Sequence, residues 1–97
     1  MNDNQDARPI DPTIEPMLVL STAHITQETC NTFLPTYPGP AWEKGEYGWF
    51  IYVPEDVDET LPVDLAACMA LARAKSAFWI MLDRDEPEVD GLPVFDW

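Results

Sequence analysis

Three short apolar runs dominate the pattern of hydrophobic positions along the chain. Residues 78–82 place five large apolar side chains in succession, which favours a strand that is covered on both faces of a sheet. Residues 17–22 begin with four apolar residues and predict a second covered strand. Residues 47–53 carry apolar side chains at odd and even positions, so they predict a central or near-central strand with a tyrosine tip in solvent. We therefore expect residues 78–83 inside the sheet, flanked by both other strands or by one of them and a helix.

The segment after the first strand has the pattern of a short helix. Thr26 can accept a hydrogen bond from a first-turn amide, and an apolar stripe follows it as far as Leu34. Pro35 is expected to end this helix. Residues 35–41 hold three prolines and a glycine and therefore predict a surface loop.

The clearest helix pattern lies between the apolar runs at 47–53 and 78–82. Thr60 and Pro62 mark its start, and Arg73 and Lys75 complement the helix dipole in its last turn. Its predicted core stripe recurs at helical spacing and consists of Leu65, Cys68, Met69 and Ala72.

The order of these elements is strand, helix, strand, helix, strand, with a hairpin predicted to turn at Lys44 and Gly45. This βαβαβ order predicts an α+β fold, in which a small mixed sheet of three to four strands packs with two helices. Residues 1–16 are polar and rich in proline, so they predict a flexible N-terminal arm ahead of a single domain at 17–97. The tail is expected to dock, because it ends in Phe95 and Trp97.

The charge balance changes this picture most. The 97 residues include five Lys and Arg against eighteen Asp and Glu, for a formal net charge of −13. Direct binding to DNA or RNA is excluded, because it depends on neutralising phosphates with basic side chains. Solubility is one reason for such a charge. The alternative is a partner that the charge suits, which would be a basic host protein or ribonucleoprotein complex.

Cysteine usage and hydropathy narrow the cellular setting. Cys30 and Cys68 have no second Cys or His at ligand spacing, so they predict free thiols in a reducing cytosol. No apolar run reaches the roughly eighteen residues of a membrane span. We expect a cytoplasmic monomer that carries no cofactor.

Two acidic clusters follow predicted strands. If the three main strands are parallel, both clusters leave the same rim of the sheet, and if the last strand runs antiparallel they separate. Alternate carboxylates in an extended segment lie about 6.5 Å apart, which is the scale of neighbouring phosphates on a nucleic-acid strand. The predicted acidic rim comprises Glu55, Asp56, Asp58, Glu59, Asp83, Asp85, Glu86, Glu88 and Asp90.

Other candidate sites are fewer. His24 is the single histidine and is expected to be a capping or half-buried structural residue. Asp83 and Asp85 resemble the Asp-x-Asp of many Mg²⁺ sites, and His24 could approach them across the rim. Arg84 between them argues against a metal there, and no nucleophile with a base or phosphate-binding glycine loop occurs. Trp42 is the tryptophan best placed to anchor a partner.

The chain also resembles a known family over about residues 17–97. The matching segments are 18–26, 48–54, 64–73, 79–85 and 95–97, and they look like a family of small acidic proteins of unknown function carried on phages and plasmids. In size and charge the chain is similar to anti-CRISPR proteins, including ones that mimic double-stranded DNA to block the type I-F surveillance complex. The first resemblance implies no activity, and neither transfers a functional residue.

The leading hypothesis is therefore a phage or mobile-element inhibitor. It would present an acidic, DNA-mimicking surface to a basic nucleic-acid-binding site of a host CRISPR-Cas surveillance complex and so block binding of target DNA. One alternative is an acidic protein-interaction or regulatory domain without DNA mimicry. The other is a metal-dependent enzyme that uses Asp83, Asp85 and His24.

Overall fold

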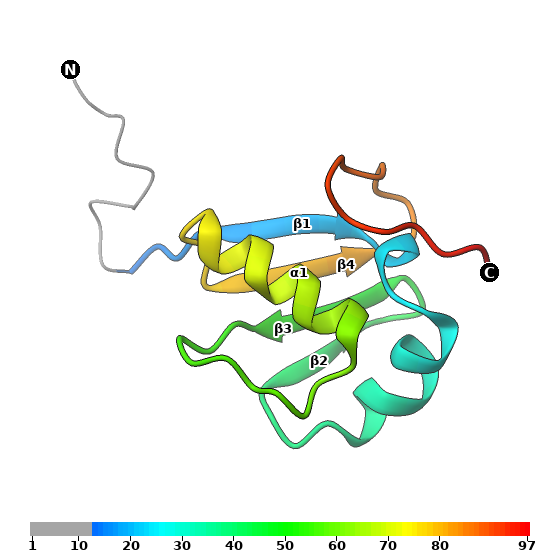
Figure 1. Cartoon of the computed structure of the whole chain (residues 1–97), viewed down its shortest axis with the longest axis horizontal. Helices are drawn as coiled ribbons and strands as arrows, with labels where there is room; N and C mark the ends of the chain where they lie inside the picture. The colour runs from blue at the N-terminus through cyan, green and yellow to red at the C-terminus, as the bar shows by residue number, and fades with distance from the viewer. Residues whose placement is uncertain (1–12) are drawn as a thin grey trace.

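The computed structural model describes residues 13–97 (Figure 1). It contains four strands, one α-helix and three short helical segments. The predicted N-terminal arm, residues 1–16, lies mostly outside the described residues. In chain order the elements are β1 (Met17–Ser21), η1 (Thr22–His24), η2 (Thr29–Phe33), η3 (Leu34–Thr36), β2 (Ala41–Lys44), β3 (Gly48–Tyr52), α1 (Val63–Ala74) and β4 (Trp79–Asp83).

The strands form one mixed sheet in the order β1-β4-β3-β2. β4 pairs in parallel with β1 and antiparallel with β3, and β3 forms a hairpin with β2. The α+β class is confirmed, and so is the interior place of β4 between the other two predicted strands. The hairpin also turns where the sequence predicted, at Lys44 and Gly45, and Gly45 has the positive φ of 56° that such a turn requires.

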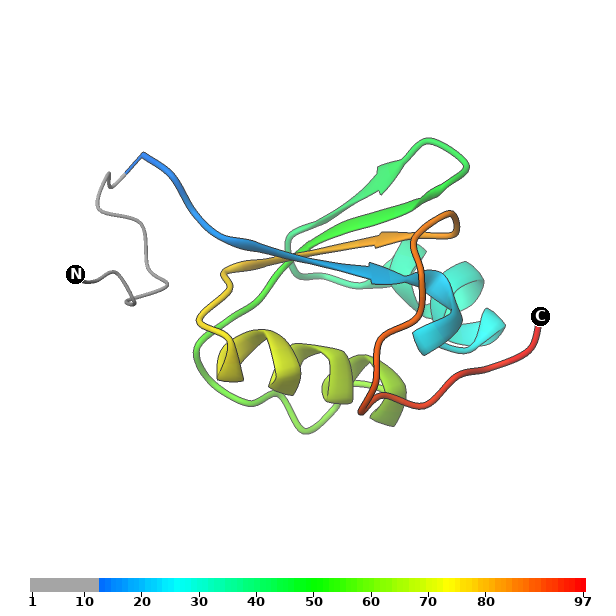
Figure 2. The same cartoon turned by 90° about the horizontal axis from the view of Figure 1, so that it is seen from above.

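Helix α1 covers one face of the sheet (Figure 2). Its predicted stripe is buried, and it packs against alternate residues of the central strands. The strand side chains in this core include Leu20, Trp49, Ile51, Ile80 and Leu82. The thiols of Cys30 and Cys68 are free and buried as predicted.

The expectation that the strands are covered on both faces is wrong. Met17 and Val19 of β1 are 41% and 38% exposed, and Trp79 and Met81 of β4 are only half-buried. The reason is that α1 lies on the opposite side, and no described helix lies over these residues (Figure 2). One face of the sheet is therefore apolar and open.

The first helical segment is less regular than predicted. It passes through the π-helical stretch η2 into η3, so Pro35 does not end it. A proline is tolerated there because it stands in the first turn of η3, where its missing N–H costs nothing. Asp64, in the first turn of α1, accepts hydrogen bonds from Thr26 N at 2.7 Å and Thr29 Oγ1 at 3.1 Å. This buried carboxylate joins the segment to α1.

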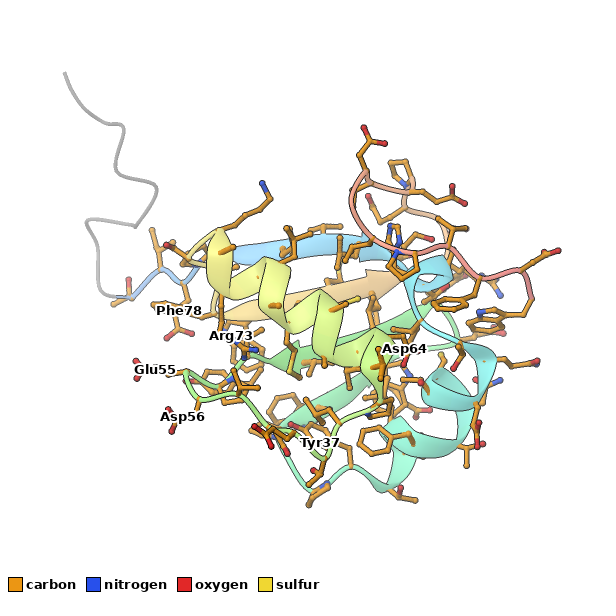
Figure 3. All side chains as sticks on the ribbon, viewed as in Figure 1. Tyr37, Glu55, Asp56, Asp64, Arg73 and Phe78 are labelled. Atoms are coloured by element: carbon orange, nitrogen blue, oxygen red, sulfur yellow. The ribbon has the colours of Figure 1, made fainter. Side chains whose placement is uncertain are left out.

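The connection from β3 to α1 determines the strand directions. Residues 53–62 run back along the length of the sheet before α1 starts, so α1 returns the chain to the end where β3 finished (Figures 1 and 3). β4 then begins beside the end of β3 and must run antiparallel to it.

The C-terminal tail docks as predicted. Phe95 N donates to Ala23 O at 2.7 Å, and Trp97 Nε1 donates to Ile25 O at 2.9 Å. Among residues 13–97, no helix combines the length and apolar character that crossing a membrane would require.

Candidate protein-binding surface

The uncovered side of the sheet presents a continuous set of apolar side chains, which we call the open sheet face. Strand alternation places its members there, because residues two apart on a strand point to the same side. The strand register aligns them in rows across the sheet, with Met17 beside Trp79 and Tyr52, and Val19 beside Met81 and Phe50. The open sheet face consists of Met17, Val19, Trp42, Phe50, Tyr52, Trp79 and Met81.

Aromatic contacts hold this surface together. The Trp79 ring lies 5.9 Å from the Trp42 ring and 5.3 Å from the Tyr52 ring, the latter in an edge-to-face arrangement. Trp42 stands in β2 and is 55% exposed. Between Trp42, Trp79 and their neighbours lies a shallow hollow of about 440 Å³, lined by Glu15, Met17, Trp42, Phe50 and Trp79. A partner side chain can enter it without a rearrangement of the sheet.

Charged groups border the open sheet face at both ends. At one end Glu15 accepts a hydrogen bond from Trp79 Nε1 at 2.7 Å. At the other end Lys44 Nζ contacts Asp83 Oδ2 at 2.7 Å. The hydrogen bond from Lys44, followed by that from the Asp85 backbone N–H, lowers the pKa of Asp83. The same contact raises the pKa of Lys44.

The two acidic clusters do not meet in space. Because β3 and β4 are antiparallel, residues 55–59 leave the sheet beside the start of β4, whereas residues 83–90 leave from its end. Figure 3 shows Glu55 and Asp56 in solvent at the end of the molecule that also holds Phe78. A strand of five residues separates the clusters by roughly 13 Å or more. The single rim expected from parallel strands is therefore absent from the sheet.

Within the clusters, two carboxylates have local structural partners. Asp83 is buried and paired with Lys44. Asp58 accepts hydrogen bonds from the backbone N–H and the hydroxyl of Thr60, which lower its pKa. The remaining predicted residues are exposed, apart from the half-buried Glu86: these are Glu55, Asp56, Glu59, Asp85, Glu88 and Asp90.

His24 is fully buried and both of its ring nitrogens are engaged. Nδ1 donates to Pro93 O at 2.8 Å, and Nε2 accepts from Val89 N at 3.0 Å, so the ring fastens the tail to η1. This agrees with the structural role expected for it. In the described part of the chain no group of three or more His, Cys, Asp or Glu is arranged to hold a metal, and Asp83, Asp85 and His24 are not brought together as one.

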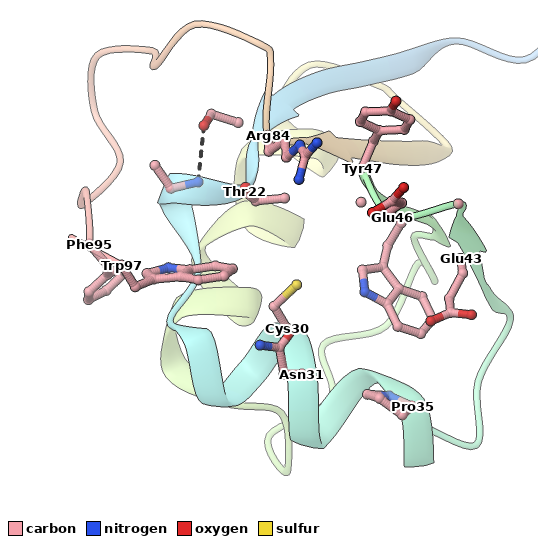
Figure 4. Close-up of a pocket in the computed structure, with 15 residues that line it drawn as sticks. Thr22, Cys30, Asn31, Pro35, Glu43, Glu46, Tyr47, Arg84, Phe95 and Trp97 are labelled. Carbon is pink, nitrogen blue, oxygen red and sulfur yellow. Dashed lines mark hydrogen bonds between the residues drawn. The ribbon is translucent and has the colours of Figure 1, made fainter.

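A second hollow of about 670 Å³ lies at the end of the sheet, between η2 and the β2–β3 hairpin (Figure 4). Its cation, Arg84, lies 4.8 Å from the centre of the Tyr47 ring. Burial raises the pKa of the Cys30 thiol in its wall, and a hydrogen bond with Trp49 partly opposes this. A thiol with a raised pKa is a poor nucleophile.

Sequence reasoning predicted Trp42 as a possible anchor for a partner but missed the surface around it. The signal was present, because all three main strands are apolar at both odd and even positions. What the pattern could not tell is whether a second layer covers the other face.

The comparisons with known proteins identify a domain family of unknown function over the range of the resemblance and add no activity. No curated protein and no solved structure matches the chain. The model of a family of unknown function, DUF5983 C-terminal domain, matches residues 17–97. The chain therefore belongs to the DUF5983 family of unknown function.

Proposed function

We propose that this domain binds a basic protein through the open sheet face. The observation that carries the proposal is the row of Trp, Tyr, Phe, Met and Val side chains that no described element covers. Contiguous apolar patches larger than a few hundred Å² are rare on monomers and commonly mark interaction sites. Aromatic residues and Met are also the types enriched at the centres of protein interfaces.

The charge of the chain selects the kind of partner. A formal net charge of −13 repels other acidic proteins and speeds the approach of basic ones. The open sheet face then supplies the short-range contact, with Trp42 as the most exposed of its aromatic side chains at 55%. Charge would thus control the association rate, and apolar contact the lifetime of the complex.

DNA mimicry by a phage-encoded inhibitor of a CRISPR surveillance complex is the second candidate. The net charge and the exposed carboxylates of both clusters support it. The separation of the clusters restricts it to two independent loops, since they do not form one continuous rim. The two proposals differ in their salt dependence, because a phosphate mimic depends on charge and an apolar face does not.

Affinity capture from a host lysate with three baits tests the first proposal. The baits are the wild type, an open-face variant carrying Trp42→Ser and Phe50→Ser, and a matched control carrying Val57→Ser and Val63→Ser. The control residues are 67% and 86% exposed and lie outside the open sheet face. We expect the wild type and the control to retain the same basic protein at about 1 M salt, where the Debye length is about 3 Å, and the open-face variant to lose it.

Elution of that protein by salt, together with its full retention by the open-face variant, would contradict the proposal. Replacement of Glu86, Glu88 and Asp90 by Lys would then be expected to abolish capture, as mimicry requires. Circular dichroism and thermal unfolding of each bait test whether the variants are folded.

A further inference from the structure

We propose that the free edge of β1 receives an extended segment of the basic partner as an additional strand of the sheet. This inference rests on the proposed function, because the added strand would belong to the protein that covers the open sheet face. It specifies the mode of binding: backbone hydrogen bonds along β1, with alternate side chains of the partner lying beside Met17 and Val19.

The backbone of β1 is available on its outer side. β1 is the last strand of the sheet, and its only strand partner among residues 13–97 is β4. Pro16 O accepts from Phe78 N on the β4 side. Backbone groups alternate in direction along a strand, so the N–H and C=O groups of Leu18 and Leu20 also point toward β4. Those of Met17 and Val19 point outward.

Nothing within β1 protects this edge. Natural proteins block free edges with charged side chains, proline or bulges. Residues Met17–Ser21 contain no charge or proline, and they pair with β4 in unbroken register. The opposite edge strand, β2, does carry charges, at Glu43 and Lys44. The difference singles out β1 as the edge for strand addition.

Charge complementarity indicates what kind of segment fits. Glu15 precedes β1, and the 84–91 segment lies beside its other end, held there by the hydrogen bond from Val89 N to His24 Nε2 (Figure 1). That segment carries Glu86, Glu88 and Asp90. A fitting strand therefore has apolar residues in its middle and Lys or Arg at both ends.

The same charges argue against a second copy as the occupant. Symmetric pairing of two β1 strands would be antiparallel. Centred on Val19, it would bring Glu15 of each copy toward the acidic 84–91 segment of the other, where like charges repel. The net charge of −13 on each chain adds to this repulsion.

The test uses eight-residue segments selected for binding to the full chain from a displayed random library. We expect the selected segments to alternate apolar and polar residues and to carry Lys or Arg at both ends. Val19→Pro removes one outward donor while sparing the bonds to β4, since proline is tolerated on sheet edges. It should weaken binding of a selected segment at least about tenfold. Val19→Thr keeps the donor and nearly the shape of the side chain, so it should weaken binding clearly less than Val19→Pro does.

Amide hydrogen exchange on the wild type provides a second measurement that does not depend on the folding of Val19→Pro. Saturation with the segment should slow exchange at Met17 and Val19 by at least about tenfold. Unchanged exchange at both amides would overturn strand addition. Segments that lose binding to Trp42→Ser with Phe50→Ser but leave these amides unchanged would retain the proposed function and refute only this mode. Segments that still bind Trp42→Ser with Phe50→Ser, leave both amides unchanged and depend on the acidic clusters instead would refute both the proposed function and strand addition.

Discussion

Neighbouring residues of β4 have opposite environments. Ile80 and Leu82 are fully buried under α1, whereas Trp79 and Met81 lie on the open sheet face. In the sequence all of them are simply large and apolar, so the usual alternation of a half-exposed strand is missing. The prediction that β4 is interior was therefore correct for its backbone and wrong for half of its side chains.

The Lys44–Asp83 pair at the end of the open sheet face predicts a pH dependence of stability. The folded protein holds the pKa of Asp83 below its ordinary 3.8. A lowered folded-state pKa adds stability above the unfolded value, and this is lost as pH falls through the folded value. Asp83→Asn should therefore lower the free energy of unfolding near neutral pH, and this difference should shrink as the pH falls below 3.8 through the lower folded-state pKa.

Urea unfolding across that pH range measures this effect. Glu88→Gln is the control, because Glu88 is exposed and should leave the curve nearly unchanged. A constant difference between the wild type and Asp83→Asn at all pH values would show that the pair contributes packing rather than charge.

At the scale of elements, the strand pattern predicted the sheet but not the direction of β3. Residues 53–62 could have led directly into a helix at the same end, which would have made β3 parallel to β4. Instead they run back along the sheet, with Leu61 buried ahead of α1. Local sequence does not encode that path, because it depends on where α1 finds an apolar face. The same path keeps the two acidic clusters apart, because they would meet only if β3 and β4 were parallel.

The two faces of β4 predict unequal costs for similar substitutions. Ile80→Ala removes a fully buried side chain and should lower the free energy of unfolding by about 2–5 kcal/mol. Met81→Ala on the open sheet face should cost less than about 1.5 kcal/mol. Urea denaturation of the two variants measures both values. Equal costs would mean that the open sheet face is covered in solution.

At the scale of the whole molecule, an apolar face and a large negative charge occur together. An open sheet face of this kind favours self-association, while a net charge of −13 opposes it in every copy. The combination keeps the face available for a partner of opposite charge. The sequence gives the charge directly and predicted the sheet, and Trp42 as an anchor stays a prediction. The open sheet face appears only when helix α1 is seen to cover one side.

Site-specific photo-cross-linking tests the central claim, that the open sheet face binds a protein, most directly. A photoreactive phenylalanine analogue replaces Phe50 on the open sheet face or, as the control, Val63 on the exposed side of α1. With the captured basic protein, we expect a cross-linked product from position 50 and none from position 63. A cross-link from position 63, with none from position 50, would contradict the account.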